Sequence, residues 1–99
     1  MYSPIHSKMY IITAYTRRQA KKLGVEVKLS ANKAKKIDVF KNGVKIASIG
    51  GAGYGDYPTF MRTHGKEHAD KRRALYKMRH EKDRHVPGSN GFLADQLLW

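Results

Sequence analysis

The sequence predicts an α+β fold with a small, mostly antiparallel sheet, a central hairpin and helices that cover it. The pair Asn42-Gly43 between two apolar-rich runs indicates the hairpin, and alternation of apolar and charged residues over 25–29 indicates another strand. The long basic segment 66–83 is typical of a helix. With 99 residues, the chain is expected to form a single domain around one modest core.

The first 36 residues are expected to form a basic arm that contains a strand, a helix and a second strand. The run Met9–Tyr15 is rich in β-branched and aromatic residues and predicts the first strand. Val25, Val27 and Leu29 alternate with charged residues and predict the second strand. A basic loop over 30–36 then leads into the hairpin.

A short helix is expected between these two strands. Thr16 with Gln19 fits the capping-box pattern, in which the hydroxyl and the amide each bind a free backbone N–H. Gly24 stands where a left-handed helix stop would fall. These signals place the helix at Arg17–Leu23. Its solvent face would carry the cations Arg17, Arg18, Lys21 and Lys22.

Residues 37–49 give the strongest local prediction, which is a β-hairpin. Asn42 and Gly43 suit a type I′ turn, because both central residues of that turn have positive φ. In that register Val39 faces Ile46. One side of the hairpin would then carry Ile37, Val39, Val44 and Ile46, and the other Phe40, Ala47 and Ile49. Since both sides are apolar, we expect other elements to cover both of them, at least in part.

The run GGAGYGDYP at 50–58 joins the hairpin to the helical part, a position where phosphate-binding loops occur. A Walker loop needs Gly-Lys-Ser/Thr, but no lysine follows here and Asp56 would repel a phosphate. The spacing of dinucleotide-binding glycines is absent too. We therefore expect a structural junction, in which Asp56 caps a short helix that has Pro58 in its first turn and ends at Gly65. The residues expected to shape the two turns are Asn42, Gly43, Gly50, Gly51, Gly53, Gly55, Tyr57 and Pro58.

The helix expected at Lys66–Asp83 lacks a clean apolar stripe. At about 100° per residue, its apolar side chains spread over a wide arc, and Arg72 and Arg79 fall within that arc between Leu75 and Tyr76. We expect this helix to cover the hairpin. Its arginines would then either lie across the edge of the hairpin or reach a partner.

The chain ends in the apolar segment FLADQLLW, which follows a turn-rich linker at 86–91. An apolar terminus rarely stays free in water. We expect it to dock back onto the protein's own domain, with insertion into a partner as the alternative.

No catalytic, cofactor-binding or metal-binding residues are expected. The chain has no cysteine, which excludes disulfides and cysteine-based zinc sites. His64 and His68 have a spacing that suits a metal on a helix, but Gly65 lies between them and no third ligand is evident. The serines and carboxylates show no spacing typical of catalysis. We therefore expect no enzyme activity, no cofactor and no small-molecule substrate.

The balance of charge points to an anionic partner. Lysines and arginines number 20 against 8 acidic residues, a net charge of +12 that a solvated monomer does not need. The tyrosines could add stacking platforms for bases, or they could be ordinary residues at the edge of a core: Tyr2, Tyr10, Tyr15, Tyr54, Tyr57 and Tyr76. No motif for sequence-specific readout appears, and no apolar segment is long enough to span a membrane.

The candidate interaction residues are cations and C-terminal apolar residues. The cations are Arg17, Arg18, Lys21, Lys22, Lys33, Lys35, Lys36, Arg72, Arg73, Arg79 and Arg84. The apolar candidates are Phe92, Leu97, Leu98 and Trp99. Together they suit a protein that contacts a polyanion or an acidic protein surface.

Three runs in the second part of the chain carry a family resemblance: the stretch from IG to GYGDYPTF, then RALYKMRHEKDR, then the closing ADQLLW. With these runs, residues 37–99 resemble a family of small, uncharacterised basic proteins encoded by nucleocytoplasmic large DNA viruses of algae and protists. Residues 1–36 lie outside the resemblance. The family has no established activity, so no catalytic residue is implied.

The resemblance implies a viral origin and a non-enzymatic role. The leading hypothesis is a minor capsid-associated protein that bridges or cements larger virion subunits. Its partners would be other virion proteins, and it would reside in the virion after synthesis in the host cytoplasm. The alternative is a sequence-nonspecific nucleic-acid-binding protein of the virus, which would contact DNA or RNA of the packaged or replicating genome.

Overall fold

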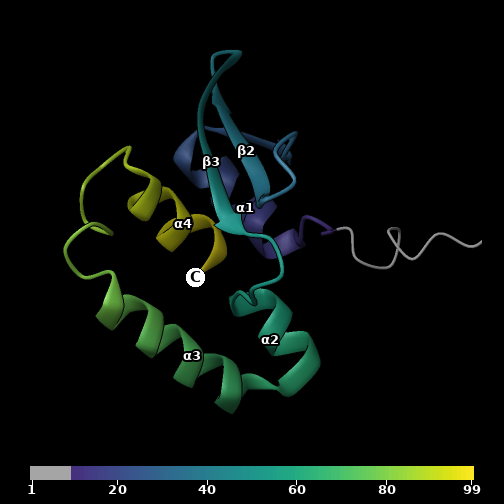
Figure 1. The fold of residues 1–99 in the computed structure, drawn as a ribbon, viewed down its shortest axis with the longest axis vertical. Helices are drawn as coiled ribbons and strands as arrows, with labels where there is room; N and C mark the ends of the chain where they lie inside the picture. Colours follow the sequence, from purple (N-terminus) through teal and green to yellow (C-terminus); the bar gives the residue numbers. More distant parts are fainter. Residues whose placement is uncertain (1–9) are drawn as a thin grey trace, which may run out of the picture.

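The computed structural model describes residues 10–99, which form four α-helices and a three-stranded antiparallel sheet of order β1-β2-β3 (Figure 1). The α+β prediction is therefore confirmed. The helices are α1 (Ala14–Leu23), α2 (Tyr57–His64), α3 (Lys66–Arg79) and α4 (Asn90–Leu98). The strands are β1 (Glu26–Leu29), β2 (Lys35–Lys41) and β3 (Val44–Gly51). Each helix of this part of the chain is too short or too polar to cross a bilayer.

The apolar core lies on one face of the sheet, where α1 and α4 pack. Its buried members come from α1, β2, β3 and α4: Ala20, Ile37, Val39, Ala47, Ile49, Leu93, Leu97 and Leu98. The apolar C-terminal segment thus docks back onto its own domain, as expected. At about 25 cal/mol per Å², the leucines of α4 make this helix a main source of stability.

The prediction that the helix at 66–83 covers the hairpin is wrong. Helix α3 ends at Arg79, packs mainly on α2 and lies apart from the sheet (Figure 1). The reason is apolar area: α3 buries only Ala69 and Tyr76, whereas α4 offers three buried leucines. The sheet is therefore covered by the helix with more to bury.

The hairpin turn is confirmed. Asn42 has φ 53° and Gly43 has φ 78°, which are the two positive values that a type I′ turn requires. Lys41 pairs with Val44 across the turn. The short side chain of asparagine and the missing side chain of glycine make these backbone angles accessible.

A β-bulge changes the register beyond the turn. Val39 pairs with Ala47, so the predicted pairing of Val39 with Ile46 is wrong. The extra residue brings Ala47 and Ile49 to the core face with Val39 and Ile37, and it leaves Ile46 42% exposed. The helices pack mainly on this core face. We expected other elements to cover both faces of the hairpin, and they cover one.

Helix α1 begins earlier than predicted. Its N-cap is Thr13, whose hydroxyl oxygen accepts a hydrogen bond from the Thr16 N–H at 3.2 Å. Thr16 is therefore a buried residue inside the helix, and its hydroxyl donates to the Leu97 carbonyl at 2.8 Å. The helix stop at Gly24 is confirmed, with φ 72°.

The strand predicted at residues 9–15 is wrong for its described part. Ala14 and Tyr15 lie in α1, and residues 10–13 form no strand. Met9 lies outside the described residues. The Thr13 cap outweighs the β propensity of this run, because the capped helix can bury Thr16 and Ala20 against the rest of the core.

The glycine-rich run forms the structural junction that the sequence indicates. Asp56 caps α2 by accepting the Thr59 N–H at 3.0 Å, and Pro58 lies in the first turn. Gly50 has φ 79°, and a Cβ atom there would lie 2.8 Å from Leu98 Cδ1. Glycine is thus needed at this position both for its backbone angle and for the close approach of α4.

Candidate functional site

A buried ion pair occupies the glycine-rich junction where a phosphate site was considered. Lys36 Nζ lies 3.0 Å from Asp56 Oδ2, and the two side chains are 5% and 0% exposed. The Tyr10 hydroxyl donates to the same carboxylate at 2.8 Å. Burial and the neighbouring Asp56 raise the pKa of Tyr10, so this hydroxyl keeps its proton. Lys36 is therefore held by an internal partner and is not part of the exposed basic surface.

A cleft of about 350 Å³ lies between the junction, α3 and α4, and we call it the central cleft. One wall comes from β2, β3 and the glycine-rich run, a second from α3, and a third from α4. Its lining includes three cations and three aromatic rings: Lys35, Arg72, Arg79, Tyr54, Tyr76 and Trp99. Figure 1 shows how the chain reaches this arrangement, since it curves from β3 through α2 and α3 back to α4.

Helix α3 presents a row of arginine, tyrosine and arginine to the central cleft. Arg72, Tyr76 and Arg79 are four and three residues apart and therefore share one face of the helix. The arginines that the sequence places among the apolar residues of this helix thus face the cleft. Arg72 also lies over the Phe60 ring, 5.5 Å from its centroid.

Aromatic rings form a second feature of the cleft. Tyr76 stacks on Trp99 with ring centroids 4.7 Å apart and planes 11° apart. It also stacks on His80 at 4.3 Å. Across the cleft, Tyr54 is 77% exposed. The residues that make this site come from positions far apart in the sequence, and no local signal predicts their meeting.

Most acidic residues are used in internal ion pairs. Within residues 10–99, only Glu26 and Glu67 have no Lys, Arg or His nitrogen within 3.8 Å. The paired acids are Asp38, Asp56, Asp70, Glu81, Asp83 and Asp95. The remaining cations are left without a nearby carboxylate. The net positive charge of the protein therefore lies on these remaining cations.

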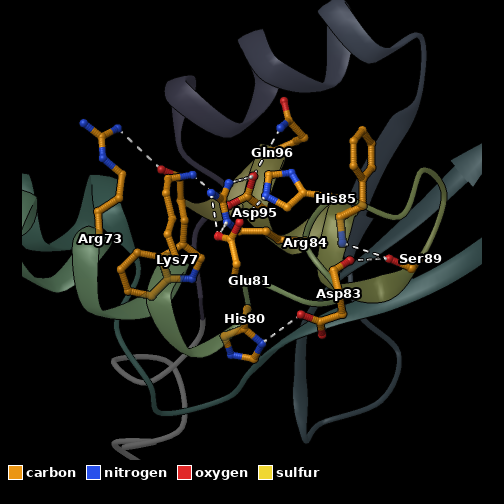
Figure 2. Close-up of polar contacts among 12 residues, drawn as sticks. Arg73, Lys77, His80, Glu81, Asp83, Arg84, His85, Ser89, Asp95 and Gln96 are labelled. Carbon is orange, nitrogen blue, oxygen red and sulfur yellow. Dashed lines mark hydrogen bonds and ion pairs between the residues drawn. The ribbon is translucent and has the colours of Figure 1, made fainter.

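Two of the predicted interaction arginines are used inside the protein (Figure 2). Arg84 pairs with Glu81 at 2.9 Å and lies 3.8 Å from the buried Asp95, which also binds Lys77 at 2.7 Å. Arg73 lies over the Tyr57 ring at 3.8 Å and donates to the Trp99 carbonyl at 3.5 Å. These contacts hold α3 and the following loop to α4, so Arg73 and Arg84 have structural roles.

The four cations of α1 remain exposed and make no ion pair with the described residues. We call Arg17, Arg18, Lys21 and Lys22 the α1 basic face. They lie within an arc of about 140°, given about 100° of turn per residue. Lys33 and Lys35 are also exposed, on the loop before β2 and at its first residue.

The apolar candidates at the C-terminus do not form a free surface. Leu97 and Leu98 are 0% and 1% exposed and belong to the core. Phe92 packs against that core, and Trp99 stacks on Tyr76. Of the two alternatives for this segment, packing within the chain is the one that the structure shows.

The histidine pair does not gather further metal ligands. His64 and His68 stack with centroids 4.5 Å apart, beside the Phe60 ring. In the chain from residue 10 onward, no group of three His, Cys, Asp or Glu side chains could hold a metal ion. Burial and the neighbouring His64 lower the pKa of His68, which favours its neutral, stacked form.

The outer face of the sheet holds a carboxylate in a dense hydrogen-bond network. The hydroxyls of Ser30 and Ser48 each donate to Asp38 at 2.6 Å, and the Ala31 N–H donates at 3.2 Å. These bonds favour the charged form and lower the pKa of Asp38 to about 2. The network ties the loop before β2 to β3.

Acid is therefore expected to weaken the fold through Asp38. Because its pKa is depressed in the folded state, the stabilisation is present above its ordinary value of 3.8 and is lost as pH falls toward about 2. Thermal unfolding between pH 5 and pH 2 should show a falling midpoint, and Asp38→Asn should flatten that fall. An equally steep fall in the variant would contradict this role of Asp38.

The chain matches no protein-family model, and no curated protein or solved structure is found to be similar to it.

Proposed function

We propose that the protein is non-enzymatic and binds the phosphate backbone of nucleic acid without reading its base sequence. The observation that carries this proposal is the use of charge: within residues 10–99 all acids except Glu26 and Glu67 lie beside a basic side chain, while the α1 basic face keeps four exposed cations without an ion pair. Nucleic acid is the polyanion that such a surface suits, because each contacted phosphate releases a condensed counterion.

Salt titration of duplex binding tests the proposal. The logarithm of the binding constant is expected to fall linearly with the logarithm of salt concentration, by about 0.9 per phosphate contact. Replacing all four residues of the α1 basic face with alanine should reduce that slope by about 3 to 4. Since these side chains are exposed, the variant should keep the wild-type unfolding midpoint.

A matched variant shows whether the salt slope depends on the α1 basic face or on the net charge of the protein. Lys41, Arg62, Lys71 and Lys82 are also exposed, and their replacement by alanine removes the same charge from other surfaces. This control should lower the slope less than the α1 variant does. Equal slopes in the two variants would contradict a role of the α1 basic face, and absent or salt-insensitive binding would contradict the proposed function.

A structural role in a large DNA virus particle, which the resemblance of residues 37–99 implies, is the second candidate. One observation favours a protein contact: Val44 and Ile46 are 63% and 42% exposed beside the turn of the hairpin. Mass spectrometry of purified particles should then find the protein in a fixed ratio to the larger subunits. Absence from the particles would remove this candidate and leave nucleic-acid binding in place.

A further inference from the structure

We propose that the central cleft holds one unpaired nucleotide of a single-stranded nucleic acid. This inference rests on the proposed function and names the ligand of a second site. The base would stack on Tyr54, and the phosphates beside it would contact Arg72, Arg79 and Lys35. The α1 basic face, by contrast, would serve duplex and single strand alike.

The size and depth of the cleft suit part of a strand. Its volume of about 350 Å³ lies near the lower end of the range of about 300–1,000 Å³ that is typical of small-molecule sites. Three segments of the chain enclose it, and the Tyr76–Trp99 stack and the buried Leu98 keep two of its walls in place. A single planar group with its phosphate fits a site of this kind better than a whole duplex does.

The charges of the cleft suit a phosphate. Arg72 and Arg79 have no carboxylate partner among residues 10–99, and Lys35 is exposed on the facing strand. The lining also holds one carboxylate, Asp83, whose side chain is 53% exposed and lies 3.5 Å from His80 Nδ1, a contact that is an ion pair only when His80 carries a proton. Three cations without a carboxylate partner therefore line the cleft on two walls, one of them (Arg72) over the Phe60 ring. Guanidinium groups bind phosphate oxygens through two parallel N–H donors.

An exposed ring stands beside these cations. Of the tyrosines considered as stacking platforms, Tyr10 and Tyr57 bind carboxylates, Tyr15 packs at a tilt against the Tyr57 ring, and Tyr76 is buried. Tyr2 lies outside the described residues. Tyr54 lines the cleft and is 77% exposed, so its ring is accessible to a ligand. Every base has a π face, which is why such a ring binds single strands with little sequence preference.

The preference for a single strand follows from this geometry. In a duplex both faces of each base are covered by neighbours in the stack, and a base must be flipped out to reach a protein ring. In a single strand a base can leave the stack at lower cost. The combination of an exposed tyrosine with unpaired arginines is the arrangement that binds such strands.

The single tryptophan allows a direct test with the full chain. Trp99 lines the cleft, so a strand bound there should quench its fluorescence in a saturable way. The probes are oligothymidylate of eight nucleotides, an abasic strand with the same phosphates, a duplex, and thymidine monophosphate. Stacking of one base is expected to make the oligothymidylate bind about 5- to 150-fold tighter than the abasic strand.

Variants test whether the preference for strands that carry bases arises in the central cleft. Tyr54→Leu should remove most of the preference for bases, and Tyr54→Phe should retain it, because phenylalanine keeps the ring. Replacing Arg72 and Arg79 with alanine should weaken oligothymidylate binding and lower its salt slope by about 1 to 2. The matched control replaces Lys71 and Lys82, which are exposed and do not line the cleft, and should leave the preference for bases unchanged.

The outcomes separate this inference from the proposed function. Equal affinity for the abasic strand and oligothymidylate, or no effect of Tyr54→Leu, would overturn the cleft assignment while duplex binding through α1 stood. Monophosphate binding as tight as that of the octamer would overturn the assignment to a strand. If none of the probes bound, both proposals would fall together.

Discussion

Replacing Asp56 with asparagine is expected to lower the free energy of unfolding by about 3–5 kcal/mol, the usual cost of leaving one partner of a buried ion pair uncompensated. Lys36 and Asp56 are 5% and 0% exposed, and water cannot replace the lost charge there. The asparagine oxygen can still accept the Thr59 N–H and cap α2, but the amide group in place of Oδ2 cannot accept from Lys36 or from the Tyr10 hydroxyl. Since domains of this size are stable by about 5–15 kcal/mol, chemical denaturation should show a large shift.

Two further variants show whether the loss comes from the pair. Asp70→Asn removes the exposed pair with Lys66, whose side chains are 72% and 40% exposed, and keeps an amide oxygen that can accept the Tyr57 hydroxyl, so it should cost far less than Asp56→Asn. Adding Lys36→Met to Asp56→Asn should restore part of the stability, because no buried charge is then left alone. A loss no larger than that of Asp70→Asn would show that Asp56 has no special role.

Leu97→Ala is expected to destabilise the fold by about 2–5 kcal/mol, because it leaves a cavity between α4 and the sheet. Leu97 is 0% exposed, and its carbonyl accepts the hydroxyl of Thr16, so it joins α4 to both α1 and the core. Guanidinium denaturation measures this loss. Removal of the C-terminal segment should therefore unfold the protein, so that a truncation cannot by itself identify a binding surface.

Met78→Ala is the matched control for Leu97→Ala. Met78 is a large apolar residue on α3, but it is 71% exposed. Its replacement by a good helix former should change the free energy of unfolding by no more than about 0.5 kcal/mol. Similar losses in the two variants would contradict the placement of α4 in the core.

Three predictions that depend on a few neighbouring residues are confirmed. Asn42 and Gly43 adopt the two positive φ angles, Gly24 ends α1, and Asp56 caps α2. At each of these positions the local backbone conformation depends on a short side chain or on its absence. The predicted start of α1 was wrong because Thr13, three residues before Thr16, is a second possible N-cap and is the one used.

The candidate site was predicted only in part. The exposed cations of α1 follow from composition and helical spacing, and so does the common face of Arg72 and Arg79. The sequence could not show that Arg73 binds the Trp99 carbonyl or that Lys36 is buried against Asp56. Such partners lie 20 or more positions away in the chain, at separations where no periodic pattern carries information.

By itself, then, the sequence determined the α+β class, the hairpin turn, the end of α1, both ends of α2 and the excess of positive charge, because each depends on local backbone preference or on composition. The tertiary structure decided the bulge beyond that turn, the choice of α4 over α3 to cover the sheet, and the meeting of Arg72, Tyr54 and Trp99 around one cleft. The physical reason is competition. Several apolar faces could cover the sheet, and only packing of the whole chain shows which one buries the most area.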